Sequence, residues 1–198
     1  PLPLDFLGGA NTEESARKVS VSLTVDETSA LLTEVPKAYN TQINDVLLTA
    51  LVQAFTNWTG NPSLFINLEG HGREEILEGM DLSRTVGWFT TDFPVLLEVN
   101  APFEPGEALK AIKEQLRSIP NQGIGYGVLR YLSEDAELIE NLRRLPKPSV
   151  GFNYLGQFDP VFNNASLHPP LKGWAMARES SGPERGPRGN RVFLLEVY

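Results

Sequence analysis

The sequence predicts an α/β fold in which helices pack against a mixed β-sheet. Short segments with alternating apolar residues are interleaved with longer segments whose apolar residues recur at three- and four-residue spacing, and these are the periods of strands and helices. The two kinds of segment follow one another irregularly, which favours a mixed sheet. Of the 198 residues, 41% are hydrophobic and 21% are charged, a composition typical of a globular chain that buries a core.

Five segments have the pattern of β-strands. In the clearest, over residues 19–25, valine and leucine alternate with serine and threonine, which predicts one apolar and one polar face. The segment 63–69 places Asn67 and Glu69 on its polar face. The remaining predicted strands cover residues 93–99, 150–155 and 192–197.

Four segments have helical periodicity and recognisable ends. Asp26 is placed to cap a helix that Pro36 ends. A second helix begins within 41–44 and runs to Trp58. The other two are an amphipathic helix over 107–119, ended by Pro120, and a helical stretch over 128–144.

Turn-forming residues divide the chain into a linker and one folded unit. Residues 1–18 contain proline, glycine and asparagine without periodicity and are predicted to be a linker, while residues 19–198 are predicted to form the folded lobe. The stretch 180–190 is rich in proline and glycine, so we expect a mobile loop there. Because the last predicted strand ends with the chain, we expect the sequence to be cut from a longer domain.

The composition excludes several classes of function. The chain has 17 basic and 25 acidic residues, a formal net charge of −8, so it lacks the basic surface that binds nucleic acid or anionic lipid. It has no cysteine, which excludes disulfides, thiolate metal sites and a cysteine nucleophile. No apolar run approaches the roughly 18 residues of a membrane span, and the first residues lack the features of a signal peptide. We therefore expect a soluble, cytoplasmic protein.

The segment EGHGRE at 69–74 concentrates the most reactive side chains. It places the carboxylate of Glu69, the imidazole of His71 and the guanidinium of Arg73 at the end of a predicted strand. The carboxylate and the histidine there can perform acid–base chemistry, or the arginine can orient the carboxylate. The alternative is a strand-to-loop turn with a surface ion pair. Since His71 and His168 are the only histidines, no metal site is expected.

Three other features have a structural explanation. The glycine-rich segment 121–127 lacks the spacing of a phosphate-binding loop and is predicted to connect two helices flexibly. Trp88 and Phe89 follow Gly87, a pattern typical of close packing, so we expect them in the core or at the floor of a cavity. Ser83 has no histidine or acid at a spacing diagnostic of a catalytic triad.

Asn153 and Tyr154 are adjacent on a predicted strand, so regular geometry points them to opposite faces. Either side chain can donate a hydrogen bond into a cavity, although the bulk of Tyr154 also fits a core aromatic. From these residues alone, the sequence predicts only an α/β lobe.

Four ordered motifs resemble those of a known family. They are EGHGRE at 69–74, RTVGWFT with the following Phe-Pro at 84–94, PNQGIGYG at 120–127 and FNYLGQFD at 152–159. Together they resemble the later signature motifs of the epimerization domains of nonribosomal peptide synthetases, which belong to the condensation-domain superfamily. Condensation domains typically carry a Phe-Val-Asn-Thr run where this chain has Trp88 to Thr91, so the resemblance favours epimerization.

The resemblance implies a two-lobed fold like that of chloramphenicol acetyltransferase, of which this chain is the C-terminal lobe. Family members carry a paired-histidine motif in the N-terminal lobe, and this chain has no adjacent histidines. They also continue past the strand predicted at 192–197. The resemblance therefore implies that the N-terminal lobe is missing, that the C-terminal end is truncated, and that the isolated chain is inactive.

The activity implied by the resemblance is inversion, from L to D, of the α-carbon of an aminoacyl or peptidyl thioester. The thioester is carried on the phosphopantetheine arm of a peptidyl carrier domain, and no directly bound cofactor or metal is implied. By resemblance, Glu69 is the carboxylate opposite a histidine of the missing lobe, and we expect burial to raise its pKa. Asn153 and Tyr154 are assigned catalytic roles at the enolate or as a proton donor. Substrate-binding roles are assigned to Arg73, His71 and Trp88.

Two alternatives remain open at the level of the sequence. A condensation-type lobe would form a peptide bond, and its product would contain a new amide. A non-catalytic lobe would only dock carrier domains, and it would tolerate the loss of Glu69, Asn153 and Tyr154.

Overall fold

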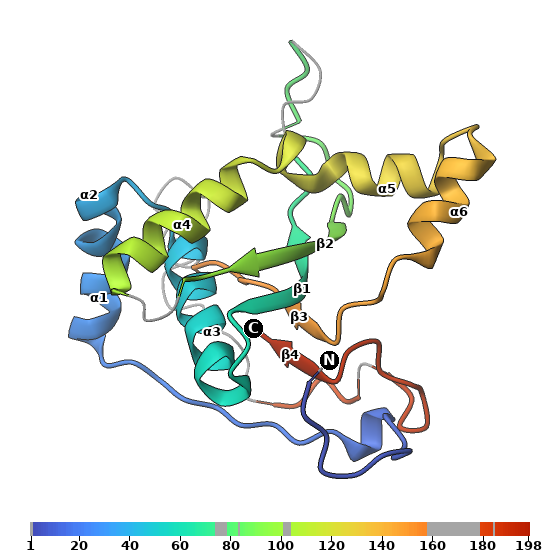
Figure 1. Ribbon diagram of the computed structural model, residues 1–198, viewed down its shortest axis with the longest axis horizontal. Coiled ribbons are helices and arrows are strands. Elements are labelled where there is room, and N and C mark those ends of the chain that lie inside the picture. Colours follow the sequence, from blue (N-terminus) through green and yellow to red (C-terminus); the bar gives the residue numbers. More distant parts are fainter. Residues whose placement is uncertain (1, 74–78, 83, 101–103, 158–178, 184) are drawn as a thin grey trace.

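A four-stranded mixed sheet forms the centre of the computed structural model, which describes residues 2–73, 79–82, 84–100, 104–157, 179–183 and 185–198 (Figure 1). The strand order is β2-β1-β3-β4. β1 (Ser63–Gly70) runs antiparallel to β2 (Thr91–Glu98) and parallel to β3 (Val150–Phe152), and β3 is parallel to β4 (Leu195–Val197). The prediction of a mixed sheet is confirmed, and each of these strands overlaps a predicted one.

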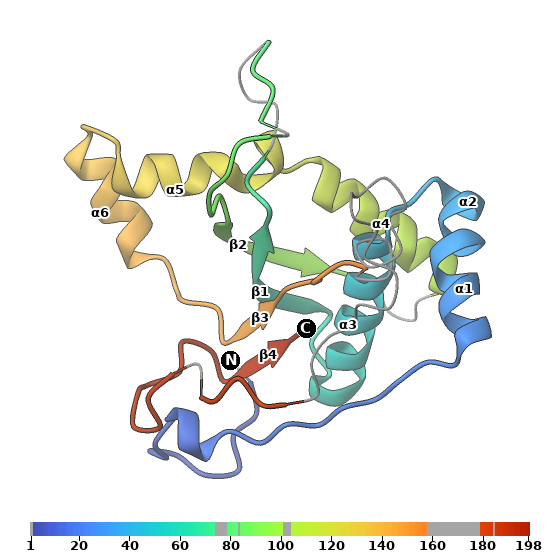
Figure 2. The ribbon, with the colours of Figure 1, turned by 180° about the vertical axis from the view of Figure 1, so that it is seen from behind.

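Two helices cover the apolar face of the sheet. α3 (Ile43–Thr59) and α4 (Pro105–Arg117) pack on each other and against β1 and β2. The view from behind shows α6 extending away from the sheet, whereas α5 also packs against β2 (Figure 2). The remaining elements are α1 (Val25–Thr33), α2 (Val35–Tyr39), α5 (Ile124–Tyr131), α6 (Ala136–Arg144) and the short 3₁₀ helices η1 (Glu13–Ser15) and η2 (Pro120–Gly123).

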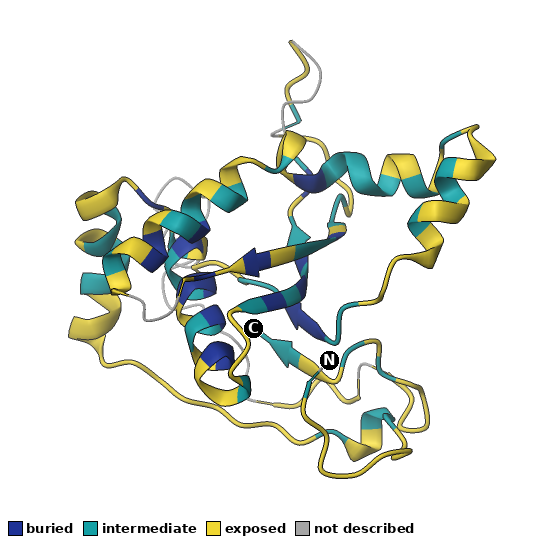
Figure 3. Cartoon of the chain, viewed as in Figure 1, coloured by how far each residue is buried: buried dark blue, intermediate teal, exposed yellow. Residues whose placement is uncertain are grey.

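The core lies between this face of the sheet and the two covering helices (Figure 3). Along β1, Leu64, Ile66 and Leu68 are buried and alternate with residues that are partly exposed, as the sequence predicts. Burying one such side chain completely stabilises the fold by about 1.5–3 kcal/mol. The largest fully buried side chains are Leu48, Val52, Ile66, Leu97, Ile112 and Val150.

The first helices begin and end at residues other than those expected. Thr24, not Asp26, caps α1, because its Oγ1 accepts a bond from the Glu27 N–H at 3.3 Å while the Glu27 carboxylate accepts one from the Thr24 N–H at 2.8 Å. Pro36 does not end a helix but lies in the first turn of α2, where its missing N–H leaves no bond unmade.

The helix predicted over 128–144 is two helices. α5 ends at Tyr131, and Asp135 starts α6 by accepting bonds from the N–H groups of Glu137 and Leu138, both at 3.0 Å. A carboxylate at this position satisfies N–H groups that have no partner within the helix, so the break is encoded by Asp135.

The strand predicted at 19–25 is wrong. Residues 17–24 belong to no helix or strand, and Val25 opens α1. In Figure 1 this segment runs past α3 to α1 without joining the sheet, and Val19 and Val21 are 89% and 93% exposed. Alternation of apolar and polar residues suits a segment to a β-sheet, but a strand also needs a neighbouring strand to which it can hydrogen-bond. The described residues provide no such neighbour here.

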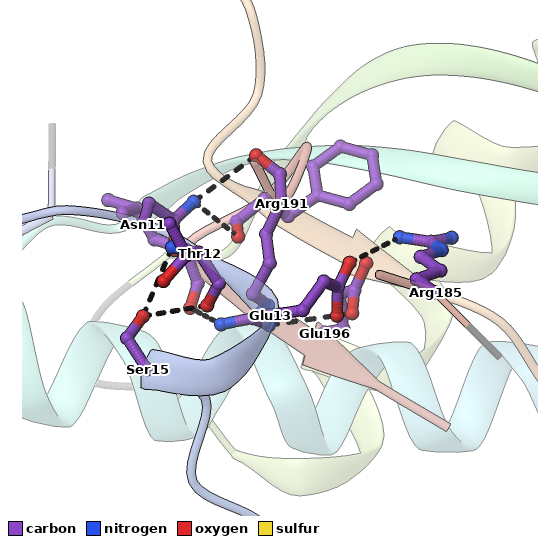
Figure 4. Close-up of polar contacts among 9 residues, drawn as sticks. Asn11, Thr12, Glu13, Ser15, Arg185, Arg191 and Glu196 are labelled. Atoms are coloured by element: carbon purple, nitrogen blue, oxygen red, sulfur yellow. Dashed lines mark hydrogen bonds and ion pairs between the residues drawn. The ribbon is translucent and has the colours of Figure 1, made fainter. Parts of the chain in front are cut away.

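Hydrogen bonds and an ion pair fasten the N-terminal segment to the end of the chain (Figure 4). The Asn11 amide donates to the Phe193 carbonyl at 3.1 Å, and the Glu13 N–H donates to the Gly189 carbonyl at 2.9 Å. The Arg185 guanidinium pairs with the Glu13 carboxylate at 3.2 Å. The stretch 180–190 is predicted to be a mobile loop, and residues 1–18 are predicted to be a linker. These contacts hold the last part of the stretch 180–190 against residues 11–13.

Gly123, in the glycine-rich segment 121–127, packs against Phe93 of β2. The segment is not a flexible connection over its whole length, since η2 ends at Gly123 and α5 begins at Ile124. Gly123 has φ +85°, and a Cβ atom there would lie 2.4 Å from ring atoms of the buried Phe93. The position therefore requires glycine both for its backbone conformation and for space.

We predict that Gly123→Ala lowers the free energy of unfolding by about 1–3 kcal/mol, because it adds strain at a positive φ and displaces Phe93. Gly127→Ala is the matched control, since that glycine is helical and its Cβ would meet nothing within 4 Å. The control should be neutral or stabilising by up to about 1 kcal/mol. Urea unfolding of the three chains measures this, and equal stability of the two variants would contradict the packing at Gly123.

Candidate active site

Glu69 and Asn153 meet at the end of the sheet where β1 and β3 finish. Glu69 is the second-last residue of β1, and Asn153 directly follows β3. The two strands are parallel and pair Leu68 with Phe152, so the residues that follow this pair lie side by side. The Asn153 side chain lies close enough to the Glu69 carboxyl to favour its ionised form. Two residues separated by more than eighty positions are thus brought into one site.

Asp92 lies on the other side of Glu69. The antiparallel pairing of β1 and β2 sets Asp92 directly opposite Glu69 and sets Pro94 opposite Asn67. The Asn67 amide donates a hydrogen bond to Asp92 Oδ1 at 2.9 Å. Asn67, Glu69, Asp92 and Asn153 therefore form a polar row across three strands, on the face of the sheet opposite the core.

The pKa of Glu69 is raised above its usual range. Burial is the largest cause, because it disfavours the charged carboxylate, and the negative charge of Asp92 acts in the same direction. The Asn153 side chain favours the ionised form and opposes the shift. The direction and the leading cause agree with the prediction made from the sequence. Asp92 was not anticipated.

Tyr154 is turned away from this row. It is partly buried and packs against the hydrophobic core, whose members Phe152 and Ile66 lie on the other face of the sheet. Alternation along the strand places Asn153 beside Glu69 and its neighbour against the core, as the sequence predicts. The catalytic role assigned to Tyr154 by resemblance stays a prediction.

Arg73 organises the loop that leads into β2. Its Nη1 donates to the carbonyls of Leu82 and Thr85, both at 2.9 Å, and its Nη2 donates to the carbonyl of Gly87 at 3.2 Å. The guanidinium carbon also lies 4.5 Å from the centre of the Phe89 ring. Three of its five N–H donors thus bind main-chain carbonyls, which makes Arg73 an anchor for the segment 82–89. Its role in substrate binding stays a prediction.

His71 and Trp88 lie at the surface. The His71 side chain is exposed, and its Nδ1 accepts a bond from the Arg73 N–H at 3.0 Å. Trp88 is 86% exposed, so the expectation that it lies in the core or at a cavity floor is wrong. Its neighbour Phe89 is partly buried beneath the Arg73 guanidinium, so the loop uses only one of its two aromatic rings for packing.

Some sequence expectations concern residues that the structure does not describe, namely Ser83, His168 and the end of the last motif at 158–159. Within the described part of the chain, no cluster of three or more acidic or histidine side chains is placed to hold a metal ion. None of the described helices combines the length and the apolar character needed to cross a bilayer.

Asp92 and Asn67 are the members of the row that sequence reasoning missed. Asn67 shares the predicted polar face of β1 with Glu69, a signal that was present but unused. Asp92 precedes the strand predicted from residue 93, and β2 begins two residues earlier, at Thr91. A strand extended through Thr91 would have placed Asp92 opposite β1.

Comparison with known proteins identifies the family. The condensation domain family matches residues 1–172. Chondramide synthase cmdD of Chondromyces crocatus is 51% identical over 196 residues, covering 99% of this chain and 5% of that protein. Gramicidin S synthase 1 of Brevibacillus brevis is 48% identical over 198 residues, covering 98% of this chain and 18% of that protein. The chain thus belongs to the condensation domain family and spans a small fraction of these relatives.

Among solved structures, the epimerization domain from the third module of tyrocidine synthetase B is similar over the whole chain. It superimposes with a TM-score of 0.83 at 38% identity, and covers 100% of this chain and 43% of that one. The fold is therefore that of one lobe of the two-lobed condensation and epimerization domains. A teicoplanin X-domain solved with OxyB has a TM-score of 0.55 at 22% identity, which shows the shared fold alone.

We predict that Arg73→Lys loosens the segment 82–89, because the ammonium group of lysine cannot reproduce the planar guanidinium geometry that donates to three carbonyls at once. Losing about 1–2 kcal/mol of local hydrogen bonding speeds opening of the loop roughly 5- to 30-fold. Chymotrypsin cleavage after Trp88 measures this. Arg84→Lys, at an exposed position of the same loop, is the control and should leave cleavage unchanged. Equal cleavage of both variants would show that Arg73 does not hold the loop.

Proposed function

We propose that this chain contributes the proton-carrying carboxyl of an epimerization site in a nonribosomal peptide synthetase. The observation that carries the proposal is the setting of Glu69, which is partly buried, flanked by Asn153 and faced by Asp92. Support also comes from the similarity of the whole of this chain, at 38% identity, to 43% of an epimerization domain. The proposed reaction inverts the α-carbon of an aminoacyl or peptidyl thioester from L to D.

The proposed chemistry needs two proton-transfer groups on opposite faces of the substrate. A base removes the Cα proton, and the electrons of the broken C–H bond move into the thioester carbonyl to give an enolate. Glu69 then delivers a proton to the opposite face of Cα and the carbonyl reforms. The base releases the abstracted proton to solvent, and Glu69 regains a proton from solvent, so that both groups return to their starting states. A free glutamate, with a pKa near 4.3, is a poor donor at neutral pH, so the raised pKa of Glu69 suits this role.

The other groups have proposed roles that follow from their positions and from the resemblance. Asn153 lies beside the carboxyl and can donate an amide hydrogen bond to the enolate oxygen. The base of the opposite face is assigned to a histidine of the N-terminal lobe. The substrate is borne on the phosphopantetheine arm of a peptidyl carrier domain, and the chemistry itself needs no metal or redox cofactor. The partners proposed for this chain are therefore that lobe and a carrier domain.

A condensation-type lobe is the second candidate, because the condensation domain family match includes such lobes as well. Such a lobe transfers an acyl group to an amine and yields a new amide without inverting a centre. Analysis of product chirality and of amide formation separates the two. A docking lobe without catalytic function would retain affinity for the carrier domain after loss of Glu69.

We predict that Glu69→Gln, in the synthetase module that contains this chain, slows inversion by about 10²- to 10⁴-fold, because the amide cannot donate the proton. Exchange of the substrate Cα proton with solvent deuterium and the chirality of the released product are measured together. Glu98→Gln is the control, since Glu98 is an exposed carboxylate at the far end of β2, bonded to Ser63, and it should keep the wild-type rate. A Glu69→Gln rate within a few-fold of wild type would remove Glu69 from the mechanism.

The isolated 198-residue chain is expected to leave the chirality of a pantetheine thioester unchanged, because it supplies only one of the two groups. Chiral chromatography after prolonged incubation tests this. Measurable racemisation, abolished by Glu69→Gln, would show that the second group is not needed.

A further inference from the structure

Asp92 stands out because the proposed mechanism does not use it, although it lies closer to the candidate acid than the sequence suggests. It faces Glu69 in the β1–β2 register, and the Asn67 amide binds its Oδ1 at 2.9 Å. Asn153 follows β3 and lies on the other side of Glu69. Each carboxyl group thus has an amide of the same polar row beside it, and both lie on one face of the sheet.

Two ionised carboxylates directly opposite each other on neighbouring strands repel. The molecule relieves the repulsion most readily by leaving a proton on the group that is harder to ionise. Glu69 is that group, because it is partly buried, whereas the Asp92 side chain is exposed to solvent. Protonation of Glu69 therefore relieves the repulsion between the two groups.

We propose that Asp92 is a positioning residue that acts through Glu69: its carboxylate, held by Asn67 directly opposite Glu69 in the β1–β2 register, favours the protonated form of the Glu69 carboxyl. The inference deepens the proposed function, on which its catalytic meaning rests. It assigns to the site a second carboxylate, which does not touch the reacting atoms but influences the pH range over which Glu69 stays protonated.

Other charged or titratable groups of the described residues near Glu69 do not reproduce this effect. His71 and Arg73 follow Glu69 on the same segment and would favour its ionised form if they acted on it. The guanidinium of Arg73 is directed to the carbonyls of the 82–87 segment. Tyr154, from the chain after β3, packs against the core. The charge that raises the pKa of Glu69 is that of Asp92.

The test titrates the Glu69 carboxyl directly in this chain. Glutamate is labelled with ¹³C at the carboxyl carbon, the Glu69 signal is assigned by its loss in Glu69→Gln, and its chemical shift is followed against pH. Asp92→Asn keeps the size of the side chain and an oxygen that can accept the Asn67 bond, but removes the charge. Removing a negative neighbour lowers the pKa of Glu69, so the midpoint should move to lower pH. Asp92→Ser should move it in the same direction.

Glu98→Gln is the matched control, because it removes the same charge from the same strand. Glu98 is six positions from Asp92 on β2, about 20 Å along a strand, well beyond the screening length of about 8 Å at physiological salt. The Glu69 midpoint should not move in this variant. An unchanged midpoint in both Asp92 variants, or an equal shift in Glu98→Gln, would overturn the inference.

The synthetase module that contains this chain then shows whether the effect reaches catalysis. If Glu69 must be protonated to act, exchange of the Cα proton falls at high pH as Glu69 ionises, and in Asp92→Asn this fall should begin at lower pH. Failure of the two hypotheses is distinguishable. A wild-type module without exchange refutes the proposed function while the titration still tests the pair, whereas exchange with an unmoved pH profile and midpoint in Asp92→Asn refutes the role of Asp92 alone.

Discussion

The parallel pairing of β1 with β3 is the constraint on which the rest of the site depends. On the core side of the sheet, this pairing sets Ile66 beside Val150 and Leu68 beside Phe152, and all four side chains are buried. A register shift of one residue would turn the apolar side chains of one strand to the opposite face. It would also move Asn153 away from Glu69. The apolar face therefore fixes the position of the polar row, and the hydrophobic effect supplies the energy that holds the carboxyl in place.

A second constraint acts in the loop before β2, where regular secondary structure is absent between Arg84 and Thr90. Carbonyls in such a segment have no strand or helix partner, and the Arg73 guanidinium binds three carbonyls of the loop. The motifs EGHGRE and RTVGWFT are thus two halves of one local structure. This loop leads into β2, whose second residue, Asp92, faces Glu69.

The sequence predicted those parts of the fold that local pattern determines. β1 has the predicted extent to within one residue because alternation and burial agree along it, and the opposite orientations of Asn153 and Tyr154 follow from strand geometry. The predicted strand at 19–25 failed because pairing depends on a neighbour that local sequence does not specify. The prediction that Trp88 is buried was wrong for a related reason. Glycine beside an aromatic residue indicates that the loop packs tightly, but it does not say which ring packs, and here Phe89 packs against Arg73. Asp92 required the register between two strands, which is a tertiary property.

The arrangement around Glu69 has a chemical consequence that goes beyond keeping it protonated. A group that holds its proton more tightly is a weaker acid but, once ionised, a stronger base, and general catalysis is most efficient when the pKa lies near the working pH. Inversion of a stereocentre is a nearly symmetric reaction, so the group that protonates Cα in one direction must remove the same proton in the other. Burial and Asp92 both shift the pKa of Glu69 upward while Asn153 restrains it. In the proposed reaction, this balance serves both directions. An acid tuned only for donation would need no such restraint, so the amide on one side of Glu69 and the carboxylate on the other are the features expected of a group that must also accept.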